Sequence, residues 1–376
     1  MFIATTLSGL EPLLAKELED LGATQVTQQL RAVSFEGDLR LLYQANYCLR
    51  TAIRILMPLH QFSATNEMEL YDGVREVDWT AWLSSTGTLA VSSTVNSEVF
   101  THSQYAALKT KDAIVDQFRE KYRFRPSVDV ENPDMQVHIH INGSTCSVSL
   151  DSSGDSLHRR GYRLEGNEAP LNEVLAAGLL KLAGWAGQMH LVDFTCGSGT
   201  ILVEAAMMAR NLPPQRQRSH FGFMGWLNYD RALWRKVKRD VHAQEREFEY
   251  LIVGSDIDDS SIEIASQNLV RAKVDEDVRL SIKDFEDRFP PQGKGIVVVN
   301  PPYGERLEPE NEDELEDIQD FYGRLGKHLK EHYKGYTAWV ISSNQTAMNQ
   351  LGLKSSEQHN LNNGALPCWF NAYPIH

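Results

Sequence analysis

The sequence predicts an α/β protein of several domains, with a doubly wound parallel sheet in residues 158–376 and two smaller α/β units before it. The chain has 376 residues, which is more than a single hydrophobic core usually organises. In its second half, apolar segments of strand length alternate with helical patterns. The last two candidate strands flank Asn362-Asn363-Gly364, which is a hairpin signal at the end of a parallel sheet.

Residues 1–60 predict the first small unit. Its expected elements, in order, are a strand over 2–6, an amphipathic helix over 9–21, a strand around 33–35 and a helix from about 38 to 50. Ser8 and Glu11 have the spacing of a capping box at the start of the first helix, and Gly22 follows its end.

Residues 61–157 predict a second small unit. Its expected elements are a half-buried strand over 89–96, a helix over 108–121, and two strands over 135–143 and 144–151. The last two strands form a hairpin around Asn142-Gly143, a pair suited to a type I′ turn. His138 and His140 alternate on one strand, which favours histidines on an exposed strand face over a metal-binding pair.

Residues 158–376 predict the parallel sheet. The candidate strands are 189–194, 250–255, 278–282, 295–300 and 337–343, followed by two near 356–361 and 366–371. A parallel sheet that ends in an antiparallel hairpin favours a methyltransferase over a dehydrogenase. The acidic segment Glu308–Asp320 is predicted to be a loop.

The charge distribution bears on possible partners. A net charge of −14 argues against nucleic acid, because phosphate binding usually needs a positive field. The basic residues are nevertheless clustered in three groups, and each group is either a local RNA contact or a solvated helix face. The groups are Lys109, Lys111, Arg119, Lys121, Arg123 and Arg125; then His158, Arg159, Arg160 and Arg163; then Arg210, Arg216, Arg218, Arg231, Arg235, Lys236, Lys238 and Arg239.

Composition also narrows the class of protein. The four cysteines are widely spread and lack zinc-site spacing, so we expect reduced thiols and no metal. No apolar stretch approaches the roughly 20 residues that cross a bilayer, and the N-terminus lacks the pattern of a signal peptide. The cytoplasm is the expected location.

A strand, a glycine loop and a helix follow one another in LVDFTCGSGTILVEAAMMA, residues 191–209. Gly197 and Gly199 allow a sharp turn and a close approach to a ligand, and the helix that starts behind Thr200 offers free N–H groups to a carboxylate. Asp256 ends the next strand, where an acidic residue can bind ribose hydroxyls. Asp284 follows the third strand and can accept a hydrogen bond from an adenine amino group, with Phe285 against the ring.

This order of features predicts a site for S-adenosyl-L-methionine. The alternative is three ordinary acidic strand ends, which does not account for the glycine loop that precedes them. The gap between the loop and Asp256 exceeds the usual 20 or so residues. We therefore expect an inserted segment over about 211–249, which contains most of the third basic group. A P-loop nucleotidase is excluded because the GxxxxGK[ST] pattern does not occur.

The fourth strand ends in IVVVNPPYGERL, residues 296–307, which is the most specific motif in the chain. Asn300 lies at a carboxyl strand end, where open α/β sheets bind ligands. Pro301 and Pro302 hold the backbone and lack N–H donors, and Tyr303 offers a flat face for a base. The Asn300 side-chain oxygen and the Pro301 carbonyl can accept the two hydrogens of an exocyclic amine. A simple proline turn after a buried strand would not explain the Asn and the Tyr.

N-P-P-Y after C-G-S-G-T resembles the amino-methyltransferases that act on adenine N6 or guanine N2. The wider set LHRRGYR (157–163), APLNEVLAAGLL (169–180), FGFMGW (221–226) and THSQYAALKTKDAIVD (101–116) resembles the THUMP-containing ribosomal-RNA guanine-N2 methyltransferases. The resemblance extends over nearly the whole chain and is greatest to the N-terminal half of the fused bifunctional 23S rRNA methyltransferase. The 376 residues resemble only the first methyltransferase half of that fusion.

The resemblance implies three domains: a ferredoxin-like domain over 1–60, a THUMP RNA-binding domain over 61–157, and a Rossmann-like class I methyltransferase domain over 158–376. It implies that the amine site is Asn300, Pro301, Pro302 and Tyr303. The implied cofactor site is Asp193, Thr195, Cys196, Gly197, Gly199, Thr200, Asp256, Ile257, Asp284, Phe285 and Asn300. The implied RNA contacts are Lys109, Lys111, Arg159, Arg160 and Arg163. One departure is Phe194, where such enzymes often carry proline.

The expected activity is therefore methylation of the N2 amine of a guanine in 23S rRNA, on free RNA or on a pre-ribosomal particle. Guanine-N2 methylation of tRNA and adenine-N6 methylation of RNA remain open within the same chemistry. A catalytically idle RNA-binding assembly factor is the alternative from another class, although intact glycine and N-P-P-Y loops argue against it. Thiouridine synthases also carry THUMP domains, but their SGGxDS-type loop is missing here.

Overall fold

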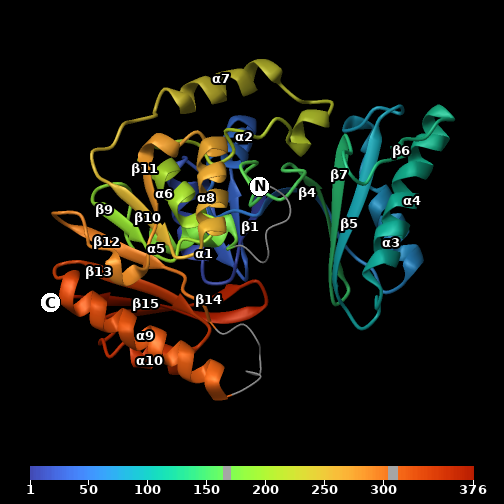
Figure 1. Ribbon diagram of the computed structural model, residues 1–376. Coiled ribbons are helices and arrows are strands. Elements are labelled where there is room, and N and C mark those ends of the chain that lie inside the picture. Colours follow the sequence, from blue (N-terminus) through green and yellow to red (C-terminus); the bar gives the residue numbers. More distant parts are fainter. Residues whose placement is uncertain (164–170, 304–311) are drawn as a thin grey trace. The chain divides into compact units, whose positions relative to one another are not determined.

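The computed structural model describes residues 1–163, 171–303 and 312–376, and within them the chain forms two compact units. The first unit comprises Met1–Thr6, Leu14–Leu157 and Arg218–Asp240. The second comprises Leu7–Leu13, His158–Gln217 and Val241–His376. Each unit contains a β-sheet of its own, and the two sheets differ in type (Figure 1).

The first unit is built on an eight-stranded sheet of mostly antiparallel pairs. Its strands, in order across the sheet, are β2 (Thr24–Gln29), β3 (Ala32–Glu36), β1 (Phe2–Thr5), β4 (Arg54–Ser63), β8 (Thr145–Asp151), β7 (Met135–Asn142), β5 (Thr88–Asn96) and β6 (Ser127–Val128). The hairpin predicted between β7 and β8 is present, and Gly143 in its turn has a φ of +59°. Glycine adopts this left-handed conformation without steric penalty.

Helices cover this sheet where its side chains are apolar. The helices of the unit are α1 (Glu11–Asp20), α2 (Leu39–Cys48), α3 (Glu67–Arg75), α4 (Ser103–Tyr122) and α7 (Arg231–His242), with short 3-10 turns at Trp79–Ala81 and Gly222–Gly225. α3 and α4 contact each other and lie on the same side of β5 (Figure 1). On β7 the alternate residues Val137 and Ile139 are fully buried. His138 points to the other face, where its Nδ1 lies 3.0 Å from the Ser92 hydroxyl.

The second unit is a seven-stranded, mainly parallel sheet, as the sequence predicts. Its strands, in order across the sheet, are β11 (Val278–Ile282), β10 (Ile252–Asp256), β9 (His190–Asp193), β12 (Gly295–Val299), β13 (Thr337–Ser342), β15 (Leu366–Pro374) and β14 (Glu357–Asn363). The five neighbouring strands β11, β10, β9, β12 and β13 are parallel. β15 pairs antiparallel with β13, and β15 and β14 form the antiparallel hairpin at one edge. All five residues of β12 are buried, which explains its continuous apolar run.

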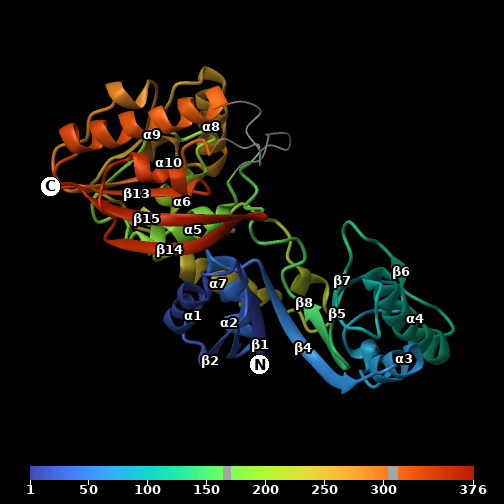
Figure 2. The ribbon, with the colours of Figure 1, turned by 90° about the horizontal axis from the view of Figure 1, so that it is seen from below.

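Helices lie on the faces of this sheet. They are α5 (Glu173–Leu182), α6 (Thr200–Ala209), α8 (Asp259–Ala272), α9 (Glu312–His332) and α10 (Gln345–Gln350), with 3-10 turns at Asp275–Asp277 and Phe285–Asp287. Figure 2 shows α9 and α10 on the same side of the sheet. Their buried side chains, such as Tyr322 and Leu325, form one core with Val297 and Val340 of the strands.

The prediction of a loop over Glu308–Asp320 is wrong for its second part, because α9 begins at Glu312. Residues 308–311 lie outside the described residues. The loop interpretation gave too much weight to acidic charge. Acidic side chains stabilise the first turn of a helix through its dipole. Further along α9, Tyr322, Leu325 and Leu329 are buried at helical spacing, which holds the helix on the sheet.

Across the described residues 1–163, 171–303 and 312–376, the structure contains no helix with the length and apolarity needed to span a membrane.

Candidate active site

The glycine loop and the N-P-P-Y segment leave the sheet at the same edge. β9 and β12 are adjacent parallel strands in which Val192 pairs with Val297. Asp193 ends β9, and Asn300 directly follows β12. Because the carboxyl ends of parallel strands meet at one edge, residues 194–199 and 300–303 begin side by side. This is the edge where open α/β sheets bind ligands.

The loop after β9 is held in a compact turn against α8. Gly197 and Gly199 have φ values of +50° and +77°, which favour glycine. A Cβ on Gly199 would lie 3.0 Å from the Cβ of Ala265 on α8. Asn268 of the same helix is buried, and its Nδ2 donates a 2.9 Å hydrogen bond to the Ser198 carbonyl. The loop backbone can therefore approach a ligand closely without losing its shape.

Asp256 connects this loop to the second strand. The Gly197 N–H donates to Asp256 Oδ2 at 2.8 Å, and the Asp258 N–H donates to Oδ1 at 3.1 Å. These two bonds fix the carboxylate at the end of β10, where a ribose diol can be bound. Ile257 beside it is an exposed apolar side chain with 69% of its surface accessible. An exposed isoleucine next to a carboxylate that could bind a ribose diol could also pack against an adenine ring.

Asp193 lies buried beneath the loop. Burial raises the pKa of its carboxyl to about 8, and the negative charge of Asp256 acts in the same direction. The Thr195 N–H donates to Asp193 Oδ1 at 3.2 Å, while the buried Thr195 hydroxyl has no hydrogen-bond partner in the described part of the chain. A cationic ligand above this carboxyl would compensate its burial. Burial also raises the pKa of the Cys196 thiol, so this residue is a neutral part of the loop.

Thr200 and Arg163 contact each other. Arg163 Nη2 donates to the Thr200 hydroxyl at 2.6 Å and to the Leu171 carbonyl at 3.0 Å, and Nη1 lies 3.4 Å from the carboxylate of Glu173. The expectation that Arg163 contacts RNA is therefore wrong for this structure. Its guanidinium contacts the starts of α5 and α6. The contact with Thr200 stabilises the residue that follows the glycine loop.

Arg160 is also wrongly predicted as an RNA contact. Its guanidinium pairs with Glu204 of α6 at 3.2 Å, and both side chains have no accessible surface. An arginine in a basic run is normally solvated, but here a carboxylate from a remote helix pairs with it inside the domain. Of the remaining predicted contacts, Arg159 is exposed, Lys111 pairs with Asp112 at 2.8 Å, and Lys109 lies 5.3 Å from the centre of the Tyr71 ring.

After β11, Asp284 and Phe285 have different environments. Asp284 is half-buried and caps a 3-10 turn by accepting from the Glu286 N–H at 2.9 Å. The ring of Phe285 is buried against Phe321, at a centroid distance of 5.0 Å, and the Arg324 guanidinium lies over it at 5.5 Å. Phe285 is thus a core residue here, which corrects the expectation that it lies against an adenine. Asp284 and Ile257 remain candidates for that contact.

The N-P-P-Y segment is held by hydrogen bonds from its own tyrosine, from α9 and from the residue before α10. The Tyr303 hydroxyl donates to the side-chain oxygen of Asn300, and the Tyr322 hydroxyl lies 3.4 Å from the Pro302 carbonyl. Asn344 Nδ2 lies 3.3 Å from the Tyr303 carbonyl. Tyr303 itself is only 6% exposed, and burial raises the pKa of its hydroxyl.

The burial of Tyr303 corrects the expectation that its ring is a stacking platform. Its hydroxyl instead donates to the side-chain oxygen of Asn300. An amide oxygen has two lone pairs, so Asn300 Oδ1 can accept from Tyr303 and from a substrate amine together.

Asn268 was missed by sequence reasoning. It stabilises the glycine loop by donating a hydrogen bond to the Ser198 carbonyl. The sequence did contain an indication of this role, because Asn268 is a polar residue among the buried residues Ala265, Leu269 and Ala272 of α8. A buried asparagine at such a position normally bonds to a neighbouring backbone.

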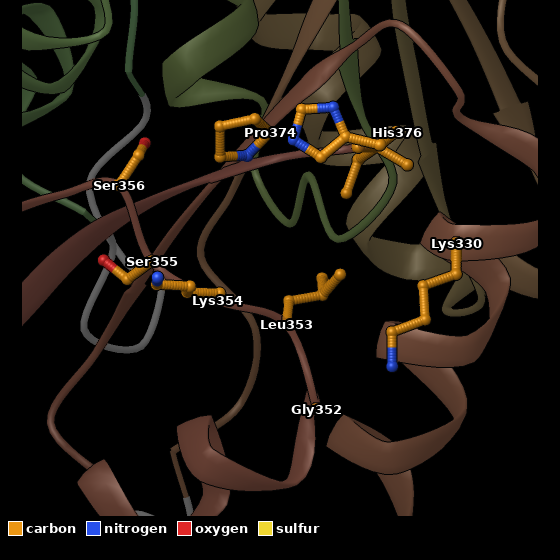
Figure 3. Close-up of a pocket in the computed structure, with 9 residues that line it drawn as sticks. Lys330, Gly352, Leu353, Lys354, Ser355, Ser356, Pro374 and His376 are labelled. Carbon is orange, nitrogen blue, oxygen red and sulfur yellow. The ribbon is translucent and has the colours of Figure 1, made fainter.

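A surface cavity of about 650 Å³ lies elsewhere on the same unit (Figure 3). It is lined by Lys330, Gly352, Leu353, Lys354, Ser355, Ser356, Pro374, Ile375 and His376. Pro374 pairs with Thr337, the first residue of β13, so this cavity is at the edge where the parallel strands begin. It is therefore not part of the candidate site. In the ranges that the structure describes, no group of three or more His, Cys, Asp or Glu side chains is arranged to hold a metal ion.

The strand order, the glycine loop and the acidic strand ends define a class I S-adenosyl-L-methionine-dependent methyltransferase domain. Three family models match the chain: an RMKL-like methyltransferase domain over residues 160–372, a THUMP domain over 64–151 and an RlmL ferredoxin-like domain over 1–56. The chain belongs to the RMKL-like methyltransferase family.

Relatives and solved structures agree with this assignment. A Synechocystis sp. protein named as a candidate RNA methyltransferase is 39% identical over 100% of this chain and 97% of its own length. The ribosomal RNA large subunit methyltransferase K/L of Syntrophotalea carbinolica is 40% identical over 98% of this chain, but the match spans only 52% of that longer protein. The crystal structure of SMU.472, a candidate methyltransferase in complex with S-adenosylhomocysteine, has a TM-score of 0.89 at 27% identity and covers 100% of this chain and 98% of its own.

Proposed function

We propose that this protein methylates the exocyclic N2 amine of a guanine in 23S rRNA, at a site of the G2445 type, and produces N2-methylguanosine. Two kinds of finding support an RNA substrate: the THUMP domain match over residues 64–151, and relatives whose names specify RNA. The domain boundaries that accompany this proposal are 1–60, 61–157 and 158–376.

The observation that carries the proposal is the position of Asn300. Its amide follows β12 at the same sheet edge as the glycine loop after β9. S-adenosyl-L-methionine supplies an electrophilic methyl group when it is bound. Gly197, Gly199, Asp193 and Asp256 would hold it, through close backbone approach, a buried carboxyl and a ribose-binding carboxylate.

The role of the protein in this reaction would be to position the substrate amine. The nitrogen of an exocyclic amine is a poor nucleophile, because its lone pair is delocalised into the ring. Asn300 Oδ1 and the Pro301 carbonyl would accept its two hydrogens, which favours tetrahedral character at the nitrogen and aims its lone pair at the methyl group. As the new N–C bond forms, the S–C bond breaks and the nitrogen becomes acidic. Its proton can then leave through these acceptors to water without a dedicated strong base.

The target base must be accessible for this geometry. A base paired and stacked in a helix cannot place its amine beside a half-buried asparagine at a strand end, so the substrate guanine would be single-stranded or flipped out. Tyr303 is buried, so the stacking partner of the base would come from another side chain.

Nucleoside mass spectrometry of rRNA and tRNA from a strain that lacks the gene tests the proposal. We expect N2-methylguanosine to be lost from 23S rRNA and restored by the wild-type gene but not by the Asn300→Ala variant. Loss from tRNA alone would overturn the rRNA assignment, and loss of N6-methyladenosine would overturn the choice of base. If no modification is lost and calorimetry detects no binding of S-adenosyl-L-methionine, the protein is not an active methyltransferase.

A further inference from the structure

Helix α7 presents a continuous basic face on a protein that is acidic overall. The face consists of Arg231, Arg235, Lys236, Lys238 and Arg239, and we call it the α7 basic face. Lys238 is half-buried and the other four side chains are exposed. The whole chain carries a formal net charge of −14, so a group of five cations on three helical turns is a local exception. The helix lies in the segment inserted between α6 and β10.

Aromatic packing within the first unit holds the opposite side of α7. Trp234 and Val237 are buried. The Trp234 ring meets Tyr47 edge-on at 5.3 Å, and it meets Phe221 at 5.5 Å in the same geometry. Tyr43 lies 6.0 Å from it. The apolar side of the helix is therefore occupied, which argues against insertion of α7 into a membrane surface.

The acidic residues beside the face are already engaged. The Asp230 carboxylate accepts hydrogen bonds from the Ala232 and Leu233 N–H groups, both at 2.9 Å, and so caps the helix. Asp240 pairs with Arg40 at 2.8 Å. Within the described residues, Arg231, Arg235 and Lys236 take part in no ion pair. In the described part of the chain, Arg231 and Arg235 thus have no ion-pair partner. Asp240 partly compensates the other end of the face, because it lies near Lys236 and 3.8 Å from Arg239.

Two arginines of the third basic group outside α7 have structural roles instead. Arg218 donates to the carbonyls of Ser153 and Asp155, at 2.9 and 2.7 Å, and Arg210 lies 3.3 Å from the carboxylate of Asp277. The exposed cations of α7 therefore differ from these two arginines, whose guanidinium groups bond to other parts of the protein.

We infer that the α7 basic face binds the phosphate backbone of the RNA substrate. The face extends about 12 Å from Arg231 to Arg239 at 1.5 Å per residue, enough for several consecutive phosphates of an RNA strand. Phosphate contacts position a nucleic acid without reading its sequence, and a rigid helix with uncompensated cations suits that task. This inference rests on the proposed function, because it assumes that RNA is the substrate.

Nitrocellulose filter binding tests the inference with two variants of equal charge change. The test variant carries Arg231→Ala, Arg235→Ala and Lys236→Ala. The control carries Arg279→Ala, Lys294→Ala and Lys334→Ala, three exposed cations at the edge where the parallel strands begin. The probe is a 23S rRNA transcript, titrated between about 50 and 200 mM KCl. Circular dichroism and thermal unfolding check that both variants remain folded, and calorimetry with S-adenosyl-L-methionine checks the cofactor site in the second unit.

We expect the test variant to bind the transcript about tenfold more weakly, with a salt dependence shallower by about two phosphate contacts, and the control to resemble the wild type. Both should keep wild-type cofactor affinity. Equal binding by the test variant and the wild type would overturn the inference and leave the proposed function intact. Equal weakening in both variants would also overturn it, because net charge alone would then suffice. A test variant that loses only binding to phosphatidylserine vesicles would assign the face to a membrane instead.

A wild-type protein that binds neither the 23S rRNA transcript nor bulk tRNA at about 50 mM KCl would contradict the proposed function itself. That outcome differs from a failure confined to α7, in which the wild type binds RNA and the α7 substitutions have no effect.

Discussion

The backbone N–H of Gly197 donates a 2.8 Å hydrogen bond to the carboxylate of Asp256, and this bond joins the first and second strand ends of the candidate site. The two residues are 59 positions apart in the chain. The bond belongs to the sheet edge, because β9 and β10 are adjacent and Asp193 pairs with Gly254. It couples the shape of the glycine loop to the group proposed to bind ribose.

Substitution of Asp256 should separate these two roles. Asp256→Asn keeps an oxygen for the Gly197 N–H but removes the charge, so we expect roughly tenfold weaker binding of S-adenosyl-L-methionine with little change in stability. Asp256→Ala removes both and should also lower the Tm. Calorimetry and thermal unfolding measure the two effects. Asp259→Asn, an exposed neighbour with the same charge change, is the control and should bind normally. Normal binding by Asp256→Ala would refute the assigned role.

Gly199 should tolerate alanine less well than Gly335, another glycine with positive φ. Gly199→Ala introduces left-handed strain of about 1 to 3 kcal/mol and places a Cβ 3.0 Å from Ala265. Gly335→Ala has a similar strain, at a φ of +83°, but its Cβ meets open space. We expect Gly199→Ala to lower both the Tm and the cofactor affinity more than Gly335→Ala does. Equal effects in urea unfolding and calorimetry would mean that the contact with α8 is unimportant.

Cofactor binding should release a proton from Asp193 below about pH 8. Burial raises the pKa of this carboxyl to about 8, so it is protonated in the free protein at pH 6.5. A bound cation favours the carboxylate, and affinity should therefore rise with pH, by up to about tenfold per unit, until pH 8. The folding stability of the free protein should depend on pH in the opposite direction from the cofactor affinity. The unfolded carboxyl ionises near pH 4 and the folded one near pH 8, so folding stability falls as pH rises through this window.

Calorimetry at pH 6.5 in two buffers with different ionisation enthalpies measures the released proton. Asp193→Asn should release none, and its cofactor affinity should not depend on pH in this range. A wild-type protein that releases no proton would contradict the prediction.

Removal of the Tyr303 hydroxyl should slow the reaction without weakening cofactor binding. In Tyr303→Phe the Asn300 amide loses the donor that orients it. We expect kcat to fall about tenfold, equivalent to about 1.4 kcal/mol, while the Kd for S-adenosyl-L-methionine is unchanged. Tyr336→Phe is a matched control, because that buried hydroxyl bonds to the Pro291 carbonyl at 2.8 Å, away from the site. A Tyr303→Phe enzyme with wild-type kcat would show that the hydrogen bond has no role in positioning.

Arg159 and Arg160 are adjacent, yet they should behave differently. Arg160→Met leaves the Glu204 carboxylate buried without its partner, and we expect a loss of about 3 to 5 kcal/mol in the free energy of unfolding. Arg159→Met removes an exposed cation and should change stability by less than about 0.5 kcal/mol. Urea unfolding compares the two. Similar stabilities of the two variants would contradict the buried ion pair. Because only Arg159 is exposed, Arg160→Met should leave the salt dependence of RNA binding unchanged.

The sequence by itself determined the sheet and which residues lie at the carboxyl ends of its strands. Strands and helices were predictable in residues 171–303, because a buried parallel strand is continuously apolar and a glycine loop has no substitute at positive φ. Asn300 could be placed for a similar reason: the carboxyl end of an apolar strand is recognisable from local sequence, and parallel strands bring such ends together.

Only the tertiary structure decided which polar and aromatic side chains are accessible. Arg160 is buried because Glu204, 44 positions away, pairs with it. Tyr303 is buried and its hydroxyl donates to Asn300, and Phe285 belongs to the core formed with α9. Exposure depends on which remote group lies opposite a side chain. Residue spacing describes one element at a time. The burial of Arg160 and the exposure of Arg231 therefore became distinguishable only from the fold, which places Glu204 beside Arg160 and no carboxylate beside Arg231 within the described residues.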